Sequence, residues 1–347
     1  MENFDPNGVG IANGNLFGFP VTEEEASIVI IPVPWDVTAS YGKGTSEGPE
    51  AILEASTQLD FFHPKLSNAW ETKVFLTPIS NEWSEINTKL CIQSIEYIQF
   101  LENGGNLKDN SDFQFVVSQI NEAQTALKNN LKERATTLFS KGKIVGVLGG
   151  EHSVPLGLIE AIDSQNESFG ILQIDAHADL RDAYEGFEQS HASIMFNAFK
   201  NCKNLTRLVQ VGIRDIADSE VKIINNNNER IKTFFDWQLK DEQFEGKTWK
   251  KQVDEIIVSL PDNVYISFDI DGLSPELCPN TGTPVPGGFK LEEINYLFFE
   301  LAKSGKKIVG FDLNEVAPGN EGDWDANVGA RALWNLICAV EKNRRNY

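Results

Sequence analysis

The sequence predicts an α/β fold with a mainly parallel central sheet. Continuous apolar runs of strand length alternate along the 347-residue chain with segments of helical periodicity, and no linker rich in Pro, Gly or Ser divides them. Such alternation is typical of parallel strands covered by helices on both faces. We therefore expect a single domain over residues 1–347.

The individual elements follow from the length and period of the apolar pattern. Strands are predicted at residues 28–33, 143–148, 170–175, 208–213, 264–270 and 307–313, where the chain is almost continuously apolar. Helices are predicted around residues 86–101, 120–138 and 291–301, where apolar residues recur at three- and four-residue steps and glycine follows. The polar stretch 102–112 lies between the first two helices and is expected to be a loop.

The overall composition excludes several classes of protein. The chain carries 30 Lys and Arg against 51 Asp and Glu, a net charge of −21 that repels nucleic acid and anionic membranes and favours cationic ligands. The four cysteines are widely spaced and form no CxxC pair, and no apolar run is long enough to span a membrane. The first ten residues lack the features of a signal peptide, so we expect a cytoplasmic protein.

Three short segments, each just after a predicted strand, carry side chains that can bind a metal ion, namely histidine, aspartate or both. His152 follows the strand 143–148, the run Asp175-Ala176-His177-Ala178-Asp179 closes the next, and Asp269-Ile270-Asp271 closes a third. Alternate residues of an extended chain project to the same side, so the acids of each run can converge. Without a cation these four carboxylates would repel one another strongly. We therefore predict a metal cluster with six ligands, His152, Asp175, His177, Asp179, Asp269 and Asp271.

These residues resemble the ureohydrolase family of arginases and agmatinases. The resemblance runs from about Pro32 to Leu333, and the segments 149–153, 175–179, 190–193, 267–271 and 310–315 match in order. It implies a three-layer α/β/α domain, two Mn²⁺ ions, hydrolysis of a guanidino compound to urea and an amine, and a homotrimer or homohexamer. The ligand types would also accept Ni²⁺ or Co²⁺.

The same resemblance assigns a role to individual residues. One ion would be held by His152, Asp175, Asp179 and Asp269, and the other by His177, Asp175, Asp269 and Asp271. Asp179 would also orient the attacking hydroxide, His191 would transfer a proton beside the substrate, and Glu315 would bind the guanidinium.

Three features depart from the pattern of the family. Glu151 stands where many members have Asp, and we expect it to support a ligand. Gly272 stands where a bulkier residue is common, which could widen or loosen the pocket. The segment 66–134 looks like an insertion, and the sequence assigns it no role.

The substrate is left open between several guanidino compounds. The run Asp-Leu-Arg-Asp-Ala-Tyr-Glu-Gly at 179–186 resembles agmatinases, and acids at 182, 185 and 188 would suit the amine of agmatine. Arg181 could instead bind a carboxylate, so arginine and guanidinobutyrate remain alternative substrates. Guanidine itself is a further alternative if the longer loops block the pocket. Agmatine, cleaved to putrescine, is the expected substrate. The alternatives of another class are a single-zinc deacetylase of related fold and a metal-binding relative without turnover.

Overall fold

The chain folds around one sheet of eight parallel strands. We describe a computed structural model, which covers residues 4–166, 168–319 and 322–347. The order of strands across the sheet is β2-β1-β3-β8-β7-β4-β5-β6, and every neighbouring pair is parallel. The strands are β1 (Ile28–Val33), β2 (Val74–Leu76), β3 (Ile144–Gly149), β4 (Phe169–Ile174), β5 (Leu205–Ile213), β6 (Ile231–Phe235), β7 (Asn263–Asp269) and β8 (Lys307–Asn314).

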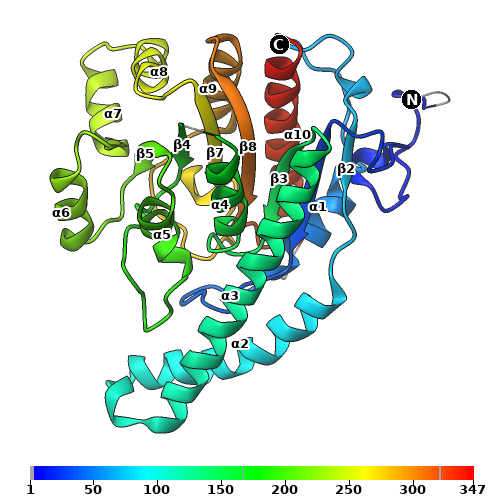
Figure 1. Cartoon of the computed structure of the whole chain (residues 1–347). Coiled ribbons are helices and arrows are strands. Elements are labelled where there is room, and N and C mark those ends of the chain that lie inside the picture. The colour runs from blue at the N-terminus through cyan, green and yellow to red at the C-terminus, as the bar shows by residue number, and fades with distance from the viewer. Residues whose placement is uncertain (1–3, 167, 320–321) are drawn as a thin grey trace.

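Helices cover both faces of this sheet. The α-helices are α1 (Gly48–Ser56), α2 (Asn81–Glu102), α3 (Ser111–Ser140), α4 (Leu156–Gln165), α5 (Ile194–Asn201), α6 (Asp218–Asn226), α7 (Asp236–Phe244), α8 (Trp249–Val258), α9 (Leu291–Lys303) and α10 (Trp324–Arg344). In Figure 1, α4 and α5 lie in front of the sheet and α9 and α10 lie behind it. Short 3₁₀ turns are η1 (Leu16–Gly18), η2 (Thr45–Glu47), η3 (Ala69–Glu71), η4 (Leu107–Asp109), η5 (His191–Ser193) and η6 (Ile270–Gly272).

The predicted α/β fold with a parallel sheet is confirmed, and so are the six predicted strands. The prediction missed β2 and β6, which are the two edge strands of the sheet. The three predicted helices are α2, α3 and α9, although α3 is longer than its apolar pattern, because it begins at Ser111. No helix in the described ranges is both long and apolar enough to cross a membrane.

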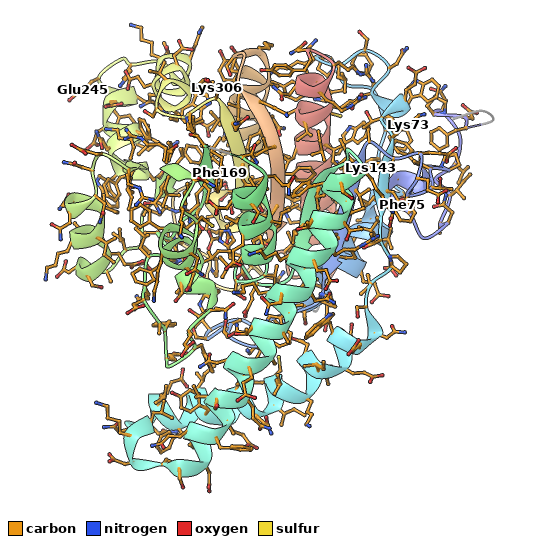
Figure 2. The ribbon with its side chains drawn as sticks, viewed as in Figure 1. Lys73, Phe75, Lys143, Phe169, Glu245 and Lys306 are labelled. Atoms are coloured by element: carbon orange, nitrogen blue, oxygen red, sulfur yellow. The ribbon has the colours of Figure 1, made fainter. Side chains whose placement is uncertain are left out.

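The order of the strands explains how distant segments of the chain meet. The strands β3, β8, β7 and β4 are direct neighbours in the middle of the sheet, although β3 and β8 lie far apart in the sequence. Figure 2 labels Lys143, Phe169 and Lys306, which lie at or next to the amino ends of β3, β4 and β8, on the upper side of the view. The carboxyl ends of these strands therefore meet on the lower side.

The segment 66–134 contributes two different pieces to the fold. Its first part contains the edge strand β2, which pairs with β1. Its second part is α2 and most of α3, which form a helical hairpin that extends beyond the lower side of the sheet (Figure 1). We refer to residues 81–140 as the helical hairpin. Whether the segment is an insertion relative to the family stays a prediction.

Candidate metal centre

Four of the six predicted ligands surround a single point at the carboxyl ends of β3, β4 and β7. The Nδ1 atom of His152 lies 3.0 Å from Asp175 Oδ2, 3.0 Å from Asp179 Oδ2 and 3.3 Å from Asp269 Oδ2. All four side chains are buried, and His152 Nδ1 has no hydrogen-bond partner among the described residues. One imidazole nitrogen carries at most one proton and cannot satisfy three carboxylates at once. The donor set therefore fits a cation at this point.

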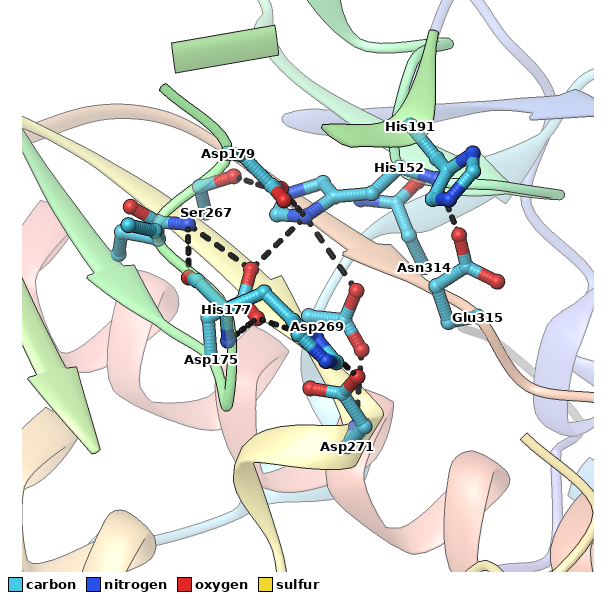
Figure 3. Close-up of polar contacts among 12 residues, drawn as sticks. His152, Asp175, His177, Asp179, His191, Ser267, Asp269, Asp271, Asn314 and Glu315 are labelled. Carbon is cyan, nitrogen blue, oxygen red and sulfur yellow. Dashed lines mark hydrogen bonds and ion pairs between the residues drawn. The ribbon is translucent and has the colours of Figure 1, made fainter. Parts of the chain in front are cut away.

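A second group of ligands shares Asp175 with the first. His177 Nδ1 lies 3.0 Å from Asp271 Oδ2 and 3.7 Å from Asp175 Oδ1. The ligand atoms of Asp175, His177 and Asp271 lie within 4.8 Å of one another, as do those of His152, Asp175 and Asp179. The structure thus brings all six predicted residues together, as Figure 3 shows. Asp269 is placed with the first group by its distance to His152.

Burial and the charges of neighbouring side chains shift the pKa values of the residues in this cluster. Burial, followed by the charges of Asp271 and Asp175, raises the pKa of Asp269 well above its usual range. Burial and Asp175 raise the pKa of Asp179 to about 7. Burial acts to lower the pKa of His152 and His177, but the surrounding carboxylates raise both well above the ordinary value. Without metal ions the cluster therefore retains protons that bound ions would displace.

Polar side chains inside the sheet hold two of these ligands in place. The Nε2 atom of His152 lies 2.9 Å from Ser267 Oγ, which donates to Asp312 Oδ1 at 3.1 Å. Gln173 donates to Asp175 Oδ2 at 2.8 Å and accepts a hydrogen bond from Gln210. Bonds of this kind fix the orientation of metal ligands. Gln173, Gln210 and Asp312 were not predicted, although a polar residue inside a continuously apolar strand is the signal that marks each of them.

Glu315 lies beside the cluster in an unusual backbone conformation. Its backbone φ is 65°, and that of Asp179 is 53°, a region that residues other than glycine rarely adopt. The Oε1 atom of Glu315 accepts a hydrogen bond of 2.7 Å from the backbone N of His152. Burial, and then the charge of Glu151, raises the pKa of Glu315 well above its usual range. Positive φ values at two predicted site residues are typical of functional sites, where local strain is tolerated.

His191 is tied to Glu151 through Thr38. Thr38 Oγ1 donates to Glu151 Oε1 at 2.6 Å and accepts a hydrogen bond of 3.2 Å from the backbone N of His191. Glu151 also accepts from Ser153 and is fully buried, which raises its pKa to about 7. Glu151 was expected to support a metal ligand, but its carboxylate accepts hydrogen bonds only from Thr38 and Ser153 among the described residues, and it reaches the backbone of His191 through Thr38. Burial, and then the neighbouring His177, lowers the pKa of His191 to about 3, so its ring is neutral at pH 7.

Arg181 lies at the edge of this arrangement. Its guanidinium is 4.5 Å from the centre of the Tyr184 ring, and its Nε atom is 3.9 Å from Glu220 Oε2. The Tyr184 ring in turn lies edge-on to His191, with 5.9 Å between the ring centres. Arg181 is therefore connected to His191 through Tyr184, while none of the ion pairs among the described residues joins it to the six ligands.

Gly272 does not widen the site, because the backbone of β4 fills the space beside it. A Cβ atom at residue 272 would lie 2.9 Å from the backbone N of Asp175 and 3.0 Å from Ile174 Cγ2. The glycine therefore permits the close approach of the two segments that carry Asp271 and Asp175. Without it, the shared ligand would be displaced.

The variant Gly272→Ala is expected to bind metal more weakly and to be less stable. The added methyl group must push the backbone of Asp175 aside, and overpacking of this kind costs about 1–3 kcal/mol. Thermal denaturation and titration with Mn²⁺ check this expectation. A variant with the melting temperature and the Mn²⁺ affinity of the wild type would contradict it.

The fold and the site together define a class of protein: a parallel α/β enzyme with a buried histidine–carboxylate cluster that can bind metal ions. The model of the arginase family matches residues 26–339, and the chain belongs to this family. It is accordingly a ureohydrolase, which confirms the resemblance noted in the sequence and argues against a single-zinc deacetylase.

Similar proteins agree with this assignment. An N(1)-aminopropylagmatine ureohydrolase of Thermus thermophilus is 31% identical over 313 residues, which is 89% of this chain and 88% of that protein. An agmatinase of Neisseria meningitidis is 29% identical over 333 residues, 93% of this chain and 92% of the other. The crystal structure of an agmatine ureohydrolase of Thermoplasma volcanium shares the fold, with a TM-score of 0.72, 21% identity and 96% coverage of both chains.

Proposed function

We propose that the protein is a binuclear manganese ureohydrolase that cleaves agmatine to putrescine and urea. The observation that carries the proposal is the pair of ligand groups that share Asp175, next to the buried carboxylate of Glu315. A guanidinium is a planar set of N–H donors, and a carboxylate is the acceptor that matches it. The homologous ureohydrolases support the reaction class.

The residues divide into those that hold the ions and those that handle the substrate. We assign His152, Asp175, Asp179 and Asp269 to one ion, and His177, Asp175, Asp269 and Asp271 to the other. Two divalent ions, when bound, supply an activated water at neutral pH and stabilise developing charge.

The substrate would be oriented by the other predicted residues. Glu315 accepts hydrogen bonds from the guanidinium and turns its central carbon toward the ligand cluster. The ring of His191 relays a proton from the attacking water to the amine that leaves when the C–N bond breaks, and because its pKa is lowered it holds this proton only transiently. Asp179 orients the attacking water. Arg181 is assigned to the binding of the far end of the substrate.

The choice of agmatine rests on charge and on the relatives. A chain of net charge −21 attracts a dication more strongly than a zwitterion. N(1)-aminopropylagmatine is the second candidate, because it is an agmatine with a longer cationic arm and gives its name to the Thermus thermophilus relative. Arginine, guanidinobutyrate and guanidine complete the set of alternatives.

A panel of substrates tests the proposal. Purified protein is loaded with Mn²⁺, Ni²⁺ or Co²⁺, and urea release is measured with agmatine, N(1)-aminopropylagmatine, arginine, 4-guanidinobutyrate, 3-guanidinopropionate and guanidine. We expect the highest kcat/KM with Mn²⁺ and agmatine. Tight metal binding with no urea from any of these compounds would contradict the proposal and favour a regulatory or scaffolding role.

The assembly and location of the protein stay predictions. Light scattering of the purified protein would test the expected homotrimer or homohexamer, and fractionation of cells would test the expected cytoplasmic location.

A further inference from the structure

A tight turn at Glu185 and Gly186 lies between the helical hairpin and His191. Tyr184 and Phe187 exchange two backbone hydrogen bonds, of 3.2 and 2.9 Å, and thereby enclose a two-residue turn. The φ angles of Glu185 and Gly186 are 56° and 85°. Turns with two positive φ values strongly prefer Asn-Gly or Asp-Gly, so glutamate is an unfavourable choice at the first position. The identity of residue 185 therefore needs a reason other than the turn itself.

The carboxylate of Glu185 has an oxygen without a partner. Its Oε2 atom is buried and accepts no hydrogen bond from the described residues, and none of their ion pairs includes Glu185. A buried carboxylate oxygen without a donor is costly. The other two acids of this loop, Asp182 and Glu188, are exposed to solvent. Among the three acids, Glu185 alone combines a strained backbone with an unsatisfied oxygen.

The residue before the turn packs against His191, which is predicted to be catalytic. Tyr184, the residue before the turn, lies against His191 with 5.9 Å between ring centres. The ammonium of Lys43 lowers the pKa of His191, and it opposes the rise in the pKa of Glu185 that burial and the charge of Glu102 cause. Lys43 itself is engaged elsewhere, since it donates to the carbonyl oxygens of Asp36 and Val37 at 2.7 and 3.0 Å.

The helical hairpin holds this turn from the other side. Tyr97 of α2 donates a hydrogen bond of 2.6 Å to the carbonyl oxygen of Glu185. Asn121 of α3 donates to the carbonyl oxygen of Gly186 at 3.2 Å and accepts from the backbone N of Glu188 at 3.0 Å. The ring of Phe187 is fully buried and lies edge-on to Tyr97, 5.6 Å away. These contacts fix the turn to a rigid element.

We propose that Glu185 determines the specificity of the site by accepting the distal ammonium group of a guanidinoalkylamine, and that Tyr97 and Asn121 are positioning residues for it. The inference rests on the proposed ureohydrolase function and deepens it. A cationic amine would supply the missing donor for Glu185 Oε2. It also gives the segment 66–134 a role, because this segment contains most of the helical hairpin, which positions the part of the site that recognises the far end of the substrate.

Two substrates that differ only in the distal amine test the proposal. Agmatine carries the ammonium group, and 1-butylguanidine has the same chain length without it. For Glu185→Gln in the Mn²⁺-loaded protein we expect KM for agmatine to rise about 10- to 100-fold, the range of one hydrogen bond between charged groups, with KM for butylguanidine unchanged. The control is Glu102→Gln, which removes an exposed charge of the hairpin that acts on Glu185, and its KM values should stay within about threefold of the wild type.

Two further variants separate recognition from structure. Glu185→Asn suits the turn better, so it should raise the melting temperature while it raises KM for agmatine, a split that a purely structural role would not produce. Tyr97→Phe removes only the hydroxyl and should raise KM for agmatine but not for butylguanidine. Equal changes of KM for the two substrates in Glu185→Gln, or none, would overturn the inference while the ureohydrolase function stands. No urea from the wild type with either substrate would overturn both.

Discussion

The variant Asp179→Asn is expected to lose at least about 10³-fold in kcat for urea release, together with one bound metal ion. Asp179 Oδ2 lies 3.0 Å from His152 Nδ1, in the group of donors that fits the first ion. An amide removes the negative charge that an ion requires. Asparagine tolerates the positive φ of this position better than alanine does, so the backbone should stay in place. Urea assays, metal analysis and circular dichroism provide the three measurements.

A surface carboxylate offers a matched control for this variant. Asp254 is exposed and pairs with Lys250 at 2.9 Å, so Asp254→Asn makes the same chemical change far from the cluster. It should leave urea release and metal content unchanged. A folded Asp179→Asn protein with full metal content and full activity would remove Asp179 from the site.

Removal of metal should destabilise the protein, and more strongly as the pH rises from 5 to 8. In the metal-free cluster the pKa of Asp179 is raised to about 7, and the pKa of Asp269 is also raised well above its usual range. A group with a raised pKa contributes stability that is complete below its unfolded pKa, about 4, and that is lost as the pH rises through the folded pKa. Bound ions need deprotonated ligands and therefore stabilise the protein most at the higher pH.

Thermal denaturation with chelator and with excess Mn²⁺ measures this difference across the pH range. At pH 8 we expect a gap of about 5 °C or more between the two melting temperatures, which shrinks toward pH 5. In Asp179→Asn the gap should be smaller, because one ligand is gone. A gap that is the same at every pH would contradict the linkage between protons and metal.

The interior of the sheet was predictable from the sequence, and its edges were not. The six central strands are buried on both faces and are therefore apolar along most of their length, with a few buried polar residues such as Gln173, Gln210 and Asp312. β2 has only three residues, and β6 contains the exposed Lys232, because an edge strand has one side open to solvent or to loops. Short or partly polar strands carry too little pattern to be distinguished from loops.

In the candidate site, too, features that depend on one short segment could be predicted from the sequence, and contacts between distant segments could not. The clustering of the six candidate ligands could be predicted because they lie in short segments just after strands, and the acids of a run such as 175–179 have the spacing that lets them converge. The contact between Glu315 and the backbone of His152 could not, since it depends on β8 lying next to β3 in the sheet. From the sequence, Glu185 is only one of three acids in a loop, because its φ angle and its unpaired oxygen are properties of the folded chain.

The left-handed backbone conformation of Asp179 and Glu315 lowers the stability of the folded protein at two residues that we assign to catalysis. Strain of this kind costs on the order of 1–3 kcal/mol at each residue, and glycine would relieve it. A library of variants selected only for resistance to heat would therefore enrich glycine at these two positions, while a library selected for urea release would reject it. Comparison of the two selections would show how far this protein sacrifices stability for activity.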